Sequence, residues 1–93
     1  MTTPLSESEI AHHLSRISSW ERSNGEISRR FEFADFAASM RFVNAVANLA
    51  EKANHHPDID IRWNKVFLRL STHSAGGLTD LDFALAEQIN ALG

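Results

Sequence analysis

The sequence predicts an α+β domain of two layers, with a four-stranded antiparallel sheet and its helices on one face. Apolar residues recur at helical spacing in three segments, and the segments between them alternate apolar and polar residues as half-buried strands do. An Asn-Gly pair, a strong signal for a tight hairpin turn, lies in the first alternating region. The expected order is helix, hairpin, helix, hairpin, helix, which is typical of a two-layer α+β fold.

The first helix and the first hairpin have clear local signals. Ser6 and Glu9 have the spacing of a capping box. The apolar residues that follow at helical intervals are Ile10, Leu14 and Ile17. The hairpin should join Trp20–Arg22 to Ile27–Phe33 across Ser23-Asn24-Gly25.

The second strand of this hairpin alternates with one exception. Phe31 and Phe33 share one face, and Arg30 and Glu32 share the other. Arg29 breaks this alternation of apolar and charged residues. We therefore expect a half-buried strand in which Arg29 is the one charged residue that does not follow the alternation.

The longest helical stretch runs from Phe36 to about Ala53, after Asp35. It should end near Asn54, because Pro57 disfavours helical geometry at the residue before it. A broad apolar face is typical of a helix that packs on a sheet. The expected stripe is Phe36, Met40, Val43, Ala47 and Ala50, broadened by Phe42, Val46 and Leu49.

The second hairpin and the last helix complete the predicted fold. Asn64-Lys65 is expected to turn the chain between two alternating strands. The apolar positions of these strands are Ile59, Ile61 and Trp63, then Val66, Leu68 and Leu70, with the second strand ending at His73. Ser74–Gly77 should form a loop, and Thr79 should cap the last helix. The expected stripe of that helix is Leu78, Leu81, Leu85, Ile89 and Leu92.

Length and composition restrict the class of protein. The chain has 93 residues, 43 % of them hydrophobic, with a net charge of −3 and no cysteine. No linker, charge block or repeat divides it, so we expect one domain over residues 1–93. The lack of cysteine excludes disulfides, a thiol nucleophile and cysteine-ligated zinc. The mildly acidic balance argues against direct nucleic-acid binding.

The sequence also indicates where the protein works. No apolar run approaches the about 20 residues that a helix needs to span a bilayer. Residues 1–10 lack the basic end and the apolar stretch of a secretory signal. We therefore expect a soluble, cytoplasmic protein with no membrane partner.

Five histidines are the main candidates for chemistry. His12 and His13 lie on the first helix with no carboxylate or glycine loop to organise them, so we interpret them as a solvated or packing pair. His55 and His56 stand where a helix gives way to a strand, and a turn there could direct both into one cleft. The alternative is a pair that only complements the helix dipole. His73, at a strand end, is either a rigidly held functional group or simply exposed.

Asp82 has a structural interpretation from spacing alone. It stands three residues after Thr79, in the first turn of the last helix. An acidic residue there complements the helix dipole and forms a weak capping box. On this basis Asp82 stabilises the helix.

These residues also carry a family resemblance. The sequence contains, in order, Asn54-His55-His56-Pro57-Asp58, Trp63-Asn64-Lys65-Val66, Leu70-Ser71-Thr72-His73 and Gly77-Leu78-Thr79, with Asp82 following. This order and spacing resemble the signature of the pterin-4a-carbinolamine dehydratases. The similarity extends from about Leu5 to Leu92.

The resemblance implies a dehydratase that converts 4a-hydroxytetrahydropterin to quinonoid dihydropterin and water, in tetrahydrobiopterin recycling. Histidine suits such chemistry because its ordinary pKa, about 6.5, lets it act as an acid or a base near neutral pH. No metal and no cofactor is implied, and the chain has no Gly-rich nucleotide loop. The expected partner is the small pterin substrate.

The resemblance also implies residue roles. His55 and His73 match the general acids, proposed to serve opposite faces of the pterin. His56 matches a residue that mainly binds substrate and can assist as a base, and Asp82 matches an acidic residue that supports the site. Trp63 could wall the pocket, although an aromatic on an alternating strand is more often part of the core. The implied substrate-binding set is Asn54, His55, His56, Ser71, Thr72 and His73.

Two other functions stay open. Family members also act as dimerisation cofactors for a homeodomain transcription factor, so the chain could be a binding module without catalysis. The histidines, with Asp58, Asp60 and Asp82, could instead hold a metal ion, although adjacent histidines rarely point to one ion.

We also expect a homodimer or a homotetramer. A domain of this size buries only about 60–65 % of its unfolded surface by itself, and two hairpins leave sheet edges that favour pairing. The family that the chain resembles assembles through sheet edges and helix faces.

Overall fold

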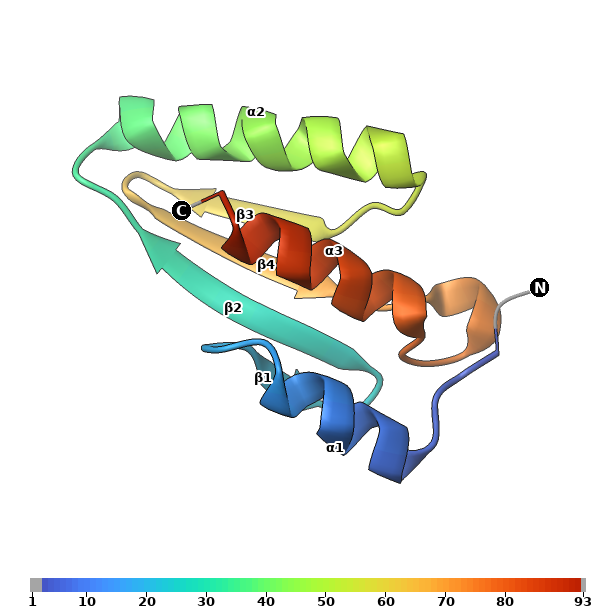
Figure 1. The fold of residues 1–93 in the computed structure, drawn as a ribbon. Helices are drawn as coiled ribbons and strands as arrows, with labels where there is room; N and C mark the ends of the chain where they lie inside the picture. Colours follow the sequence, from blue (N-terminus) through green and yellow to red (C-terminus); the bar gives the residue numbers. More distant parts are fainter. Residues whose placement is uncertain (1–2, 93) are drawn as a thin grey trace.

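A computed structural model describes residues 3–92 of the chain and confirms the predicted fold class (Figure 1). Four antiparallel strands form one sheet in the order β1-β2-β4-β3. Three α-helices accompany it, and α2 and α3 run beside each other over the sheet (Figure 1). The elements are α1 (Glu7–Ser15), β1 (Glu21–Ser23), β2 (Glu26–Glu32), α2 (Phe36–Ala53), β3 (Asp58–Arg62), β4 (Lys65–Leu70), the 3-10 helix η1 (His73–Ala75) and α3 (Asp80–Asn90).

The core lies between the helices and one face of the central strands. Ile27 of β2 is opposite Leu70 of β4, and Phe31 is opposite Val66. Residues opposite each other in antiparallel strands point to the same face. Ile27, Val66 and Leu70 are fully buried, so this is the face that the helices cover.

The local signals at the start of the chain are confirmed. Ser6 accepts a hydrogen bond from the Glu9 backbone, and Glu9 reaches back to close the capping box of α1. Asn24 takes the left-handed conformation in the β1–β2 turn, with φ 53°. Arg22 donates two hydrogen bonds to Glu7, at 2.5 and 2.8 Å. This contact ties β1 to α1 and lowers the pKa of the Glu7 carboxyl from its ordinary value.

The bounds of α2 agree with the prediction, but its predicted buried stripe is wrong in part. Phe36 and Ala47 are exposed. The ring of Phe42 packs against Phe31 and Phe33, with centroids 4.6 and 4.9 Å apart. Because these strand phenylalanines meet Phe42, the buried face is centred on Phe42 and Val46, which were predicted only to broaden the stripe, and it keeps Ala50 of the predicted stripe. The buried residues of α2 are Ser39, Phe42, Val46 and Ala50.

The turn of the second hairpin forms one residue earlier than predicted. Trp63, expected on the strand, lies in the turn with φ 54° and is 66 % exposed. Lys65, expected in the turn, is the first residue of β4. Asn64 is buried and exchanges two hydrogen bonds with the Phe33 backbone, at 2.8 and 3.1 Å. Because these bonds hold Asn64 beside Phe33, and β4 begins at the next residue, the turn consists of Trp63 and Asn64.

β4 ends at Leu70 and does not continue to His73 as predicted. The backbone of Thr72 instead pairs with that of Gly77, at 3.3 Å from N to O. This pairing closes residues 73–76 into a tight loop, in which His73 begins the short helix η1. The expected loop therefore has its own turn of 3-10 helix.

The predicted cap of α3 is confirmed, and its stripe is partly wrong. Thr79 and Asp82 form the capping box. Asp82 is on the inner face, and Leu81 lies about 100° round the helix from it, toward solvent. Leu92 is exposed as well. The buried residues of α3 are Asp82, Phe83, Leu85, Ala86 and Ile89.

Two leucines of α3 provide a matched test of this packing. Leu85 is 1 % exposed and Leu81 is 38 % exposed. Leu85→Ala should lower the free energy of unfolding by about 2–5 kcal/mol, because it leaves a cavity in the core, whereas Leu81→Ala should cost much less. Urea unfolding of both variants measures the difference. Equal losses would contradict the orientation of α3.

Candidate functional site

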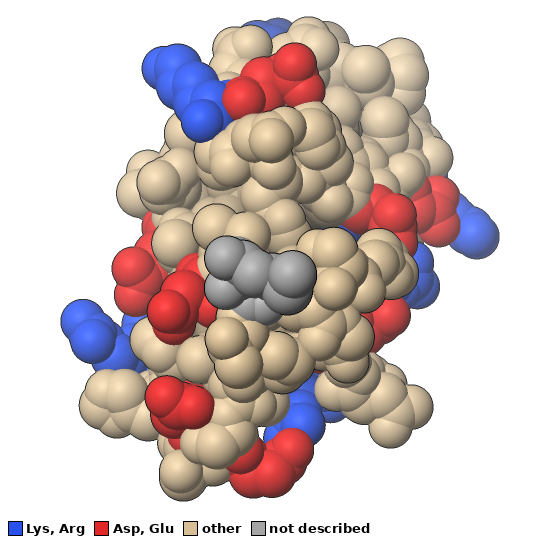
Figure 2. Space-filling model, turned by 90° about the vertical axis from the view of Figure 1, so that its right-hand side faces the viewer, with Lys and Arg blue, Asp and Glu red and all other residues tan. Residues whose placement is uncertain are grey.

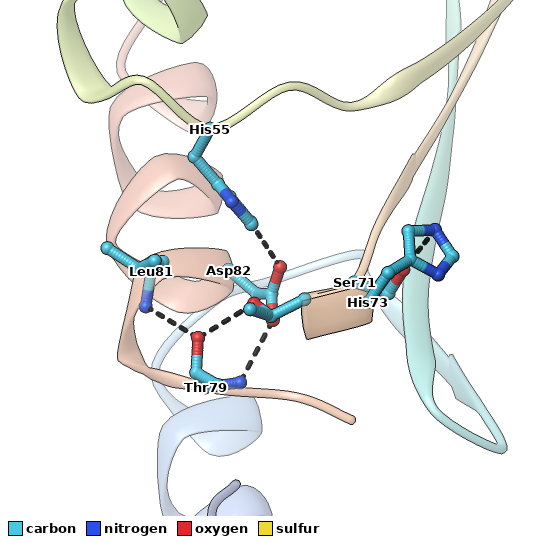
Figure 3. A network of polar contacts seen from close by, with 7 residues as sticks. His55, Ser71, His73, Thr79, Leu81 and Asp82 are labelled. Atoms are coloured by element: carbon cyan, nitrogen blue, oxygen red, sulfur yellow. Dashed lines mark hydrogen bonds and ion pairs between the residues drawn. The ribbon is translucent and has the colours of Figure 1, made fainter. Parts of the chain in front are cut away.

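The contact at the centre of the site joins His55 to Asp82. Asn54 ends α2 in the left-handed conformation, with φ 50°, and this turns the following residue toward α3. His55 Nε2 then lies 2.6 Å from Asp82 Oδ1 (Figure 3). The side chains are 9 % and 0 % exposed, respectively. A carboxylate without access to water thus faces an imidazole that is almost buried.

The other oxygen of Asp82 is held by two donors. Asp82 Oδ2 accepts from the Thr72 hydroxyl at 2.8 Å and from the Thr79 backbone nitrogen at 2.9 Å. The hydroxyls of Thr72 and Thr79 are 2.8 Å apart, and both side chains are buried. Thr79 Oγ1 also accepts from the Leu81 backbone nitrogen at 3.2 Å (Figure 3). These bonds fix the position of the carboxylate before any ligand binds.

This network determines which nitrogen of His55 is free. Two donors, the Thr72 hydroxyl and the Thr79 backbone N–H, converge on Asp82 Oδ2, as suits a carboxylate. An ionised carboxylate can only accept, so His55 must donate from Nε2. The neutral ring then carries its proton on Nε2 and a free lone pair on Nδ1. Nδ1 is therefore the atom that can take a proton from a ligand, or give one when the ring is charged.

His56 points away from this network. Its Nε2 lies 2.6 Å from Glu51 Oε2, and both side chains are exposed. Successive side chains of an extended segment point in opposite directions, so only His55 meets Asp82. Glu51 was not predicted as the partner of His56. An acidic residue in the last turn of the helix before the histidine pair is the signal that could have indicated it.

His73 belongs to a second part of the site. It is exposed, and its Nε2 lies 3.3 Å from Ser71 Oγ (Figure 3). The contribution of the β1–β2 turn to the cavity beside it was not predicted, because Asn24 and Gly25 are far from His73 in sequence. The cavity is about 430 Å³ in volume and is lined by Ser23, Asn24, Gly25, Glu26, Ser71, Thr72, His73, Gly76 and Gly77.

Thr72 is the link between the two parts. Its hydroxyl bonds Asp82, and the residue also lines the cavity of His73. The structure thus connects His55, Asp82 and Thr72 by hydrogen bonds and places His73 beside Thr72. His56 and Asn54 stand at the exposed end of α2. Asn54 contributes its left-handed backbone to the turn that orients His55.

Of the two histidines of α1, His13 packs and His12 is solvated, but the expectation that no carboxylate lies near them is wrong, because Asp80 approaches His13. The ring of His13 stacks on Phe83 of α3, with centroids 5.0 Å apart. His13 Nε2 is also 3.4 Å from Asp80. His12 is exposed. These contacts fasten α1 to α3, and neither histidine lines the cavity of His73.

Charges are scattered at the end of the molecule where α2 finishes and η1 lies. Figure 2 shows basic side chains apart from one another, mostly near the rim, with acidic side chains interspersed among them. Among residues 3–92, no three His, Asp or Glu side chains are placed so that they could hold a metal ion. No helix in the described part of the chain has the length and hydropathy to cross a bilayer.

Comparisons with known proteins match almost the whole chain. The model of the family described as pterin 4 alpha carbinolamine dehydratase matches residues 3–92. A Chloroflexus aurantiacus protein is 56 % identical over 88 residues, covering 95 % of each chain. A protein from Roseiflexus sp. (strain RS-1) is 51 % identical over 92 residues, covering 99 % of each chain. Both relatives are provisionally named pterin-4-alpha-carbinolamine dehydratases.

Two solved structures share the fold. A Brucella melitensis protein, described as a transcriptional coactivator/pterin dehydratase, is 36 % identical with a TM-score of 0.93, covering 97 % of this chain and 98 % of its own. A pterin dehydratase-like protein, described as a RuBisCO assembly factor in the alpha-carboxysome, is 26 % identical with a TM-score of 0.64. That match covers 78 % of this chain and 84 % of the other.

The network around Asp82 predicts the tautomer of His55. Neutral His55 should carry its proton on Nε2, because the carboxylate must receive it there. Long-range ¹H–¹⁵N NMR correlations, recorded about two pH units above the ordinary histidine pKa of about 6.5, distinguish the two nitrogens. The exposed His12 is the control and should average between tautomers. A protonated Nδ1 in His55 would contradict this geometry.

Proposed function

Because the chain belongs to the pterin 4 alpha carbinolamine dehydratase family, we propose that it removes water from a 4a-hydroxytetrahydropterin to give quinonoid dihydropterin. The observation that carries this proposal is the 2.6 Å contact between the buried Asp82 carboxylate and His55. It holds a histidine at the edge of the core with one nitrogen free for proton transfer. The carboxylate that meets His56, in contrast, is exposed to solvent.

The reaction needs two proton movements. The C4a–O bond breaks when an acid protonates the hydroxyl, which then leaves as water. A base takes the proton from N5, and the electron pair of that N–H bond forms the C4a=N5 double bond. No electron acceptor is required, so histidine side chains can supply both steps.

We assign general-acid roles to His55 and His73. His55 would transfer its proton through Nδ1, while Asp82 stabilises the charged ring through Nε2. His73 would act from the loop that begins at the end of β4. His56, oriented by Glu51, would bind the substrate and assist as a base. Asp82 is in this scheme a positioning residue, because it acts through His55.

Three of the expected substrate-binding residues, Ser71, Thr72 and His73, line one cavity, and Asn54, His55 and His56 stand outside its lining. The cavity beside His73, about 430 Å³, falls within the range of small-molecule sites, about 300–1,000 Å³. Ser71 would present its hydroxyl to the polar edge of the pterin, and Asn54 would approach from the end of α2. Thr72 would line the cavity while its hydroxyl holds Asp82. The product would be the quinonoid dihydropterin of tetrahydrobiopterin recycling, with no metal or other cofactor.

A stopped-flow assay tests the proposal directly. The decay of a 4a-carbinolamine is followed with and without the purified protein, and the spontaneous rate is subtracted. We expect a faster decay whose added rate is proportional to protein concentration.

The second candidate is a partner-binding module, which is favoured by the coactivator and assembly-factor descriptions of the structural relatives. No effect on decay, together with capture of a defined partner, would favour that candidate.

Single histidine variants test the assignment of roles. His55→Ala, His56→Ala and His73→Ala should each slow catalysed dehydration, since removal of a general acid or base costs about 10²–10⁴-fold. His12→Ala and His13→Ala are the controls and should keep the wild-type rate. Circular dichroism checks that each variant is folded. A loss as large in the α1 variants would show that the site lies elsewhere.

The pH profile and chelation distinguish acid–base chemistry from metal chemistry. An acid and a base drawn from histidines predict a bell-shaped rate, with limbs within about one or two units of the ordinary histidine pKa of about 6.5. The rate is measured at several pH values before and after exhaustive EDTA treatment. Loss of activity with EDTA and recovery with zinc or iron would refute the acid–base mechanism.

We also propose that the chain assembles as a homodimer or a homotetramer. β3 is the outermost strand on its side of the sheet, and Ile59 and Ile61 are exposed there. A free strand edge with apolar side chains favours pairing with another chain. Light scattering at micromolar concentration should give a multiple of the 10.4 kDa chain mass. A monomer under these conditions would contradict the assembly.

A further inference from the structure

Arg29 holds a positive charge on the core side of a central strand. It lies on β2 opposite Leu68, on the face that carries Ile27 and Phe31. Arg29 is half-buried there, and an arginine on such a face is usually paired with a carboxylate. Among residues 3–92, no carboxylate is within ion-pair distance of Arg29, and its buried Nε has no hydrogen-bond partner. The irregularity in the sequence pattern is therefore a charge that no carboxylate of residues 3–92 pairs with.

Neutral groups hold this guanidinium in place. Arg29 Nη1 donates to Asn90 Oδ1 at 2.5 Å, and the same oxygen accepts from Trp20 Nε1 at 2.8 Å. The guanidinium carbon also lies 4.3 Å from the centroid of the Phe31 ring. These contacts orient the side chain but leave its charge unbalanced.

Arg29 lines a cavity of about 450 Å³ between β2, the first half of α2 and the end of α3. Arg41 of α2 contributes a second positive charge, and the described residues provide no ion pair for it. The single carboxylate of the lining, Glu32, is 3.7 Å from Arg30. The full lining is Arg29, Arg30, Phe31, Glu32, Phe33, Arg41, Phe42, Ala45, Asn90 and Leu92.

We propose that this cavity binds a small aromatic oxyanion, with its ring among Phe31, Phe33 and Phe42 and its oxyanion toward Arg29 and Arg41. Guanidinium groups match the geometry of carboxylates and phosphates, and aromatic side chains pack well on a planar ring. The cavity shares no lining residue with that of His73. The inference is thus independent of the proposed dehydration.

An NMR titration of the ¹⁵N-labelled protein tests the site. The indole N–H of Trp20 is the reporter, because it shares its acceptor with Arg29. Benzoate and phenyl phosphate are the probes, and the tighter of the two identifies the preferred oxyanion. We expect a saturable shift of the Trp20 signal, while the amide of Gly76 beside His73 stays unchanged. Absence of a saturable shift with both probes would overturn the proposal.

Two further ligands test each half of the recognition. Benzyl alcohol has the ring without the charge, and inorganic phosphate has the charge without the ring. Both should bind at least about tenfold more weakly than the better aromatic anion, because each lacks one set of contacts. Equal binding of either ligand would overturn the aromatic-oxyanion proposal.

A pair of variants on α2 tests the role of the charge. Arg41→Gln changes an exposed residue that lines the cavity. It should weaken the binding of the better probe by about tenfold. Lys52→Gln removes a cation from the last turn of the same helix, away from the cavity, and should leave binding unchanged. Arg29→Met should abolish binding. If this variant does not fold, the comparison of Arg41→Gln with Lys52→Gln still tests the proposal. Equal effects of the two α2 variants would refute the site.

Discussion

Burial of the Asp82 carboxylate is the constraint on which the candidate site depends. A carboxylate without access to water is costly unless donors surround it. Asp82 meets this requirement with donors from three segments: His55 after α2, Thr72 after β4 and the backbone of Thr79 at the start of α3. Because each donor must reach the same group, the network fixes how the ends of these elements approach one another.

The two oxygens of Asp82 have different tasks. Oδ2 closes the capping box of α3, and Oδ1 meets His55. The structural interpretation of this residue and the functional one are therefore compatible, since a single carboxylate does both. The cap holds Asp82 rigidly, and a rigid acceptor is what orients an imidazole for proton transfer. Thr72 links this rigid network to the cavity beside His73, because it bonds Asp82 and also lines that cavity.

Much of the fold could be predicted because its signals are local. The caps at Ser6 and Thr79 and the turn at Asn24 depend on residues no more than a few positions apart. The orientation of α2 could be predicted only in part. Phe42, Val46 and Ala50 were expected on its apolar face, but which side of that broad face is buried depends on contacts with β2 that helical spacing does not contain. For the same reason the spacing of His55 and Asp82, 27 residues apart, could not show that they touch. Their connection was implied by the family resemblance alone.

We propose above all that Asp82 acts in catalysis through His55. A double-mutant cycle on carbinolamine dehydration tests it most directly, with the rates of His55→Ala, Asp82→Asn and the double variant compared with wild type. Circular dichroism confirms that each variant is folded. If the claim is correct, the double variant is no slower than His55→Ala, because the partner of Asp82 is already lost. Multiplicative losses from the two substitutions would contradict it.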